Sequence, residues 1–127
     1  MSIANYLRFL MVFVGISGCF SVLFGAWLAH AGQALELSVQ TRLASALQYQ
    51  FIHTLALLAV IIWYQQQASK SLLIVASGFV LGILAFSGSL YLITFLMIDE
   101  IGKLAPIGGS ILALSWLFVA LAGRKNT

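Results

Sequence analysis

The chain has 127 residues, of which 62% are hydrophobic and 7% are charged, and its formal net charge is +3. A soluble domain of this length needs a polar surface, and this composition does not supply one. The six Lys and Arg residues stand singly or in one pair, which excludes the basic stripe of a nucleic-acid-binding protein. We therefore interpret the chain as an integral membrane protein whose first partner is the lipid bilayer.

Four stretches without a charged residue cover residues 9–29, 43–64, 71–98 and 104–123. Each has the roughly 20 apolar residues that a helix needs to cross a bilayer. A spanning segment must bond its amides internally, which favours helices, and short connections make consecutive helices antiparallel. The sequence predicts an all-α membrane protein, with residues 1–127 forming a single integral membrane domain. The predicted architecture is an antiparallel bundle of four transmembrane helices, up-down-up-down.

The first stretch resembles a signal peptide, because Arg8 precedes an apolar run that ends in an A-x-A motif at residues 29–31. Its length of 21 uncharged residues exceeds the usual apolar region of about 7–15 residues. We therefore expect it to be retained as a transmembrane helix. In the following loop, residues 32–42, Leu35 and Val39 lie four apart between polar neighbours, which favours a short interfacial helix.

Basic residues are unequally divided between the two sides of the predicted bundle. The side with both termini and the second loop carries four basic residues and no acid: Arg8, Lys70, Arg124 and Lys125. The other side carries Arg42 and Lys103 together with three acids. An excess of Lys and Arg marks the cytoplasmic side, so both termini are predicted to face the cytoplasm.

Small residues predict where the helices touch, because helix association in lipid relies on close backbone approach. In the third stretch the small residues are Gly78, Gly82, Ala85 and Ser89. In the fourth, one bulky member interrupts the line Gly109, Ala113, Trp116 and Ala120. The predicted packing glycines are Gly18, Gly25, Gly78, Gly82, Gly88, Gly108 and Gly109. A glycine-lined conduit is the alternative.

Polar side chains inside the stretches form one candidate site. Counted from the outer ends of the second and third stretches, Gln50 lies level with Tyr91 at a depth of about 10 Å, and His53 with Ser87 at about 15 Å. We expect these four side chains to converge between the second and third helices. The candidate polar layer consists of His30, Tyr49, Gln50, His53, Ser87, Ser89 and Tyr91.

Two functions remain open for this polar layer. Its members can hydrogen bond between helices as packing groups, each bond contributing about 0.6 kcal/mol on average. Alternatively, His53 binds a small polar ligand or relays a proton, because an ionisable residue inside a membrane is a functional candidate. Two histidines without a cysteine or acid at matching depth do not make a closed zinc site. We predict no metal, no cofactor and, for lack of any catalytic motif, no enzyme.

Four segments resemble signatures of the YgdD family: FGAWLAH (24–30), LQYQFIHTLA (47–56), FSGSLY (86–91) and PIGG (106–109). That family comprises small bacterial inner-membrane proteins of uncharacterised function. Leu28 stands where the family pattern has a second glycine, so close approach of a neighbour is not implied there. The resemblance implies four helices in the inner membrane, and it implies no activity.

These observations favour a non-enzymatic accessory or scaffold component that packs with itself or with a larger membrane complex. The alternative is a small-molecule, lipid, quinone or proton carrier that uses the polar layer. A water-accessible pocket that reaches His53 favours the carrier. A fully bonded polar layer together with an exposed stripe of small residues favours the scaffold.

Overall fold

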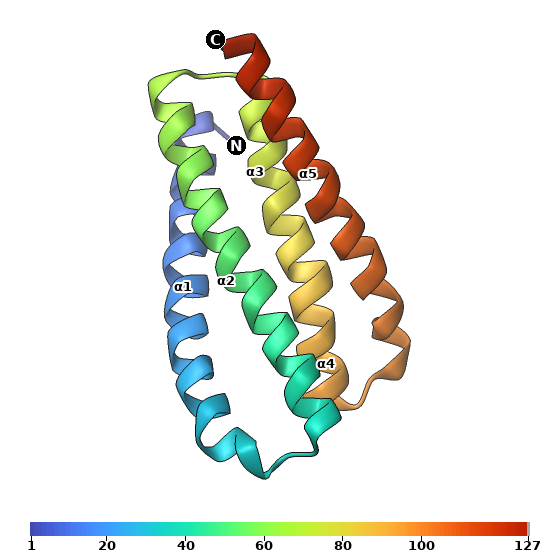
Figure 1. Ribbon diagram of the computed structural model, residues 1–127. Coiled ribbons are helices and arrows are strands. Elements are labelled where there is room, and N and C mark those ends of the chain that lie inside the picture. The colour runs from blue at the N-terminus through green and yellow to red at the C-terminus, as the bar shows by residue number, and fades with distance from the viewer. Residues whose placement is uncertain (127) are drawn as a thin grey trace.

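The computed structural model describes residues 1–126, and these residues are almost entirely helical and contain no strand (Figure 1). The helices are α1 (Ile3–Ala29), α2 (Leu37–Gln66), α3 (Lys70–Ile83), α4 (Ser89–Leu96) and α5 (Leu104–Asn126). A π-helical turn, Leu84–Gly88, joins α3 to α4, so that the two make one span. The prediction of an all-α membrane protein with four antiparallel spanning helices is confirmed.

Local chemistry explains several helix ends. The hydroxyl groups of Ser2 and Ser69 accept backbone N–H groups in the first turns of α1 and α3, as N-cap residues do. Pro106 lies in the first turn of α5, where its missing N–H costs no helical hydrogen bond. Met97 ends α4 in the left-handed conformation, with φ of 54°, and the chain turns there into the 3₁₀ segment Asp99–Lys103.

The predicted interfacial helix in the first loop is wrong, because α2 begins at Leu37. The connection contains only one short 3₁₀ turn, Ala31–Ala34. The side-chain amide of Gln40 donates to the carbonyl of Leu35 at 2.7 Å and to that of Gln33 at 3.1 Å. These bonds tie the turn to the first turns of α2, so the polar residues of this segment extend a transmembrane helix.

The four spans are arranged with two inner and two outer helices. α2 packs against α1 on one side and α3 on the other, while α5 packs mainly along α3. Figure 1 shows α1 and α5 at the flanks, and both termini at the same end of the molecule. The bundle therefore leaves much of α1 and α5 facing the lipid.

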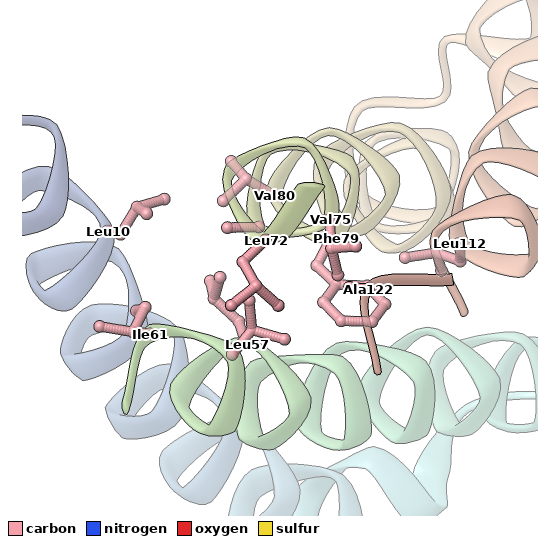
Figure 2. Packing of buried hydrophobic residues seen from close by; sticks show 11 residues of the cluster. Leu10, Leu57, Ile61, Leu72, Val75, Phe79, Val80, Leu112 and Ala122 are labelled. Carbon is pink, nitrogen blue, oxygen red and sulfur yellow. The ribbon is translucent and has the colours of Figure 1, made fainter. Parts of the chain in front are cut away.

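The hydrophobic core lies between α2, α3 and α5, and α1 contributes only Leu10 to its fully buried members (Figure 2). The cluster consists of Leu10, Leu57, Val60, Ile61, Leu72, Val75, Ala76, Phe79, Val80, Leu112 and Ala122. In a bilayer the surrounding chains are as apolar as these residues. The cluster is therefore held by van der Waals contact rather than by exclusion from water.

Three glycines allow the third span and α5 to approach closely. A Cβ added to Gly78 would overlap the side chain of Ser115, and one added to Gly82 would overlap Leu112. A Cβ on Gly108 would overlap the backbone of the π turn. The residues of α5 that contact the third span are thus Gly108, Leu112 and Ser115. Each lies one position before a residue of the predicted line Gly109, Ala113 and Trp116.

The other predicted packing glycines lie in looser surroundings. A Cβ on Gly25 would be 3.4 Å from Leu47, and one on Gly109 would be 3.7 Å from Phe86, which are ordinary contacts. A Cβ on Gly18 or Gly88 would meet no atom within 4 Å. At these two positions the missing Cβ is therefore not what allows a neighbouring helix to approach.

Candidate functional site

A buried hydrogen-bonded cluster joins α1, α2 and α4. The side-chain amide of Gln50 donates from Nε2 to Ser17 Oγ at 3.0 Å, and its Oε1 accepts from the hydroxyl of Tyr91 at 2.7 Å. Ser17 Oγ lies 2.7 Å from Thr54 Oγ1. Ser17, Gln50 and Thr54 are buried, and Tyr91 is partly buried. We call these four residues the glutamine cluster.

The directions of the bonds in the glutamine cluster follow from counting protons. Thr54 donates to the backbone carbonyl of Gln50 at 2.7 Å. A hydroxyl has a single proton, so Ser17 is the donor to Thr54 and the acceptor from Gln50. This order fixes the amide of Gln50 with its nitrogen toward Ser17 and its oxygen toward Tyr91. One amide N–H of Gln50 has no acceptor within residues 1–126.

A second cluster surrounds His53 on the side of α2 that faces α5. His53 Nδ1 lies 2.6 Å from the carbonyl oxygen of Tyr49, and the indole Nε1 of Trp116 donates to His53 Nε2 at 3.0 Å. Because an indole N–H only donates, Nε2 accepts and Nδ1 carries the proton. The imidazole is neutral in this arrangement, and both of its nitrogens are bonded within the protein.

Aromatic rings enclose His53. Its ring centroid is 5.6 Å from that of Phe79, 5.9 Å from Tyr49 and 6.0 Å from Trp116. Only 5% of the residue is exposed. Metal binding would require a free ring nitrogen, and in this arrangement neither nitrogen is free. Nor do any three His, Cys, Asp or Glu residues of the described chain come together as a metal site.

Only part of the predicted polar layer belongs to these two clusters. Gln50 and Tyr91, which the sequence places at the same depth, bond to each other. His53 and Ser87, also placed at the same depth, do not. The hydroxyl of Ser87 instead donates to the backbone carbonyl of Ala46 at 2.6 Å, which ties the π turn to α2.

The remaining predicted residues have local or peripheral places. Ser89 donates to the carbonyl of Phe86 within its own span at 2.8 Å. Tyr49 supplies a backbone carbonyl to His53, and the residue is 44% exposed. His30 is exposed at the end of α1, and it belongs to neither cluster.

Three participating residues were missed by the sequence reasoning. Ser17 and Thr54 lie inside apolar runs, and only the four-residue spacing from Gln50 to Thr54 and from Ser17 to Ser21 signals them. Trp116 appeared as the bulky member of a line of small residues. Nothing in that pattern indicates its bond to His53.

A groove opens toward the lipid between α1 and the third span, beside the glutamine cluster. Its volume is about 240 Å³, and Ser17, Gln50 and Tyr91 are the polar residues of its lining together with Ser87. Apolar side chains of α1 and the third span make up the rest of its lining, apart from Gly88. The groove therefore combines an apolar wall with a few polar groups, as ligand sites do.

Contacts at both ends of α1 frame this groove. Near the N-terminal end, the hydroxyl groups of Tyr6 and Ser77 form a hydrogen bond between α1 and α3. Toward the other end, the rings of Phe20 and Phe24 pack edge-on against Tyr91, with centroids 5.5 and 5.2 Å away. α1 is thus pinned to the third span on either side of the opening.

Comparison with known proteins adds relatives over most of the chain. The family described as "Protein of unknown function (DUF423)" matches residues 24–109. A UPF0382 membrane protein of Haemophilus influenzae is 34% identical over 117 residues, which cover 91% of this chain and 94% of that protein. The UPF0382 inner membrane protein YgdD of Escherichia coli K12 is 31% identical over 119 residues, which cover 93% and 91%. No solved structure matches the chain significantly.

Proposed function

Because the chain belongs to the DUF423 family, whose relatives are named as membrane proteins without an activity, we propose that it is a non-enzymatic scaffold or accessory component of an inner-membrane complex. Its partner docks on the lipid-facing side of α1. Both termini face the cytoplasm, since four of the six basic residues lie on their side of the membrane.

The outer face of α1 is the observation that carries this proposal. The residues that α1 buries, Leu10, Ser17, Ser21 and Leu28, share one face of the helix. The opposite face presents Gly15, Cys19 and Ala26, all exposed, at spacings of four and seven residues. A line of small residues lets another transmembrane helix come close enough for van der Waals contact and weak Cα–H bonds. This line therefore fits a partner helix.

The polar interior supports a scaffold rather than a proton or metal carrier based on His53. The hydroxyl protons of the glutamine cluster and both nitrogens of His53 are bonded within the protein. Groups that satisfy one another in this way hold helices in register, and they leave His53 no free nitrogen with which to pass on a proton.

Cross-linking at position 19 tests the docking face, because Cys19 is the only cysteine in the chain and is exposed. A photoreactive residue placed there should give one discrete adduct in native membranes. An adduct of twice the chain's mass identifies a second copy, and any other mass identifies a different partner. The same residue at Ala59, an exposed position on α2, should give none.

A blocking variant makes this test specific. A Cβ added at the exposed Gly15 meets no atom of the bundle within 4 Å, so Gly15→Leu should leave the fold intact and abolish the adduct at position 19. Ala59→Leu is the matched control and should retain the adduct. If no discrete adduct forms at position 19, or if Gly15→Leu leaves it unchanged, α1 is not the docking face.

A further inference from the structure

We propose that the groove between α1 and the third span binds a lipid-soluble molecule whose ring carries a carbonyl oxygen, a quinone being the simplest member of this class. The groove lies on a different face of α1 from Gly15, Cys19 and Ala26, so the two sites are independent. One can fail its test while the other passes.

The amide of Gln50 supplies the polar contact. Gln50 lines the groove and is only 7% exposed. One of its N–H groups is used by Ser17, and the other has no acceptor within residues 1–126. A buried donor without a partner is costly, and more so in hydrocarbon than near water. A ligand carbonyl supplies the missing acceptor, and the site's own hydroxyl protons are already engaged.

Depth distinguishes a ring carbonyl from the ester carbonyl of a membrane lipid. Gln50 lies eight residues along α2 from Arg42, the basic residue at the outer end of this span, which corresponds to about 12 Å. Lipid esters lie at the interface, outside the hydrocarbon core. A carbonyl that reaches Gln50 must therefore belong to a molecule that enters the core.

The walls of the groove suit a single flat ring. Phe13 and Phe20 of α1 and Tyr91 of α4 contribute aromatic side chains to the lining, and aromatic rings pack favourably edge-on or offset against another ring. The volume of about 240 Å³ is below the roughly 300–1,000 Å³ of most ligand pockets. Gly88 lines the groove, and a Cβ there would meet only open space. The missing side chain at Gly88 thus keeps the groove open.

Binding of two matched probes to the full chain in detergent micelles tests this proposal. A decyl-substituted benzoquinone should bind saturably at one per chain in equilibrium gel filtration. Decylbenzene has a ring and a tail without a carbonyl, and it should bind about tenfold or more weakly, the change expected for one lost hydrogen bond to a buried donor. Equal binding of the two probes would overturn the role of Gln50.

Two variants locate the site. Gly88→Leu should fill the groove and abolish quinone binding, whereas Gly18→Leu adds the same side chain where a Cβ also meets no atom and should bind like the wild type. Ile16→Trp narrows the groove from an exposed position, with Ile16 67% exposed, and serves if Gly88→Leu does not fold. Absence of quinone binding to the wild type, or full binding to both groove variants, would refute the proposal.

Discussion

Gly108 is the position where an added methyl group should be least tolerated. A Cβ there would lie 2.7 Å from the carbonyl carbon of Ala85 and 2.9 Å from Phe86 Cα, and closer still to the backbone nitrogen of Phe86. Heavy atoms in good contact are about 3.5 Å apart, and the Phe86 nitrogen is the nearest atom to the added Cβ, so α5 and the π turn would have to separate by about 1 Å. Because the obstructing atoms are backbone, no side chain can rotate away.

We expect Gly108→Ala to lower the free energy of unfolding by about 1–3 kcal/mol relative to Gly109→Ala, the usual cost of overpacking. Both variants gain the same helix preference of alanine over glycine, about 1 kcal/mol. At Gly109 the nearest atom to an added Cβ is Phe86 Cδ2 at 3.7 Å. Unfolding by a denaturing detergent, titrated into micelles, measures the difference. Equal stability of the two variants would show that α5 does not pack on the π turn.

Three further predictions concern the polar clusters and the topology. Trp116→Phe and His53→Gln should each lower the free energy of unfolding by about 0.6 kcal/mol, and by at most about 1.7 kcal/mol. In a double-mutant cycle the two effects should be less than additive. Strictly additive effects would mean that the two side chains do not interact. Tyr91→Phe should cost a similar amount, because it removes the donor to Gln50 Oε1; unchanged stability would argue against that bond. Reporter proteins fused to either end should both report the cytoplasm, and a periplasmic signal from one fusion would contradict the charge argument.

The helices could be predicted from the sequence because a bilayer imposes length and polarity on every segment that crosses it. The depth of a residue along its helix could also be predicted, since each residue advances the helix by about 1.5 Å. This calculation correctly placed Gln50 and Tyr91 at the same depth. The rotation of each helix about its own axis, which decides the side chains that face a neighbour, could not be predicted in this way. α1 carries small residues on several faces, and only its packing against α2 shows that Ser17 points inward.

The pairing of His53 with Ser87 failed for a related reason. Equal depth does not bring two side chains together unless they also face one another. Ser87 lies in the π turn, and its hydroxyl donates to the backbone carbonyl of Ala46. His53 faces α5 and accepts a hydrogen bond from Trp116. On α5 the pattern of small residues allowed two neighbouring contact lines, and packing against Gly78 and Gly82 selects the one that contains Ser115 and Leu112.

The π turn has a consequence for how related chains should be aligned. Its bonds run from residue i to i+5 rather than i+4, so the third span accommodates one residue more than a regular helix of the same rise. Each residue turns an α-helix by about 100°. Deleting one residue within Leu84–Gly88 would therefore restore a regular α-helix and leave Tyr91 beside Gln50, whereas the same deletion elsewhere in the third span would swing Tyr91 away by about 100°. A related chain that is one residue shorter in this segment is therefore expected to have a regular helix in place of the π turn and the same neighbours around the third span. The length of this segment is thus as informative as its composition.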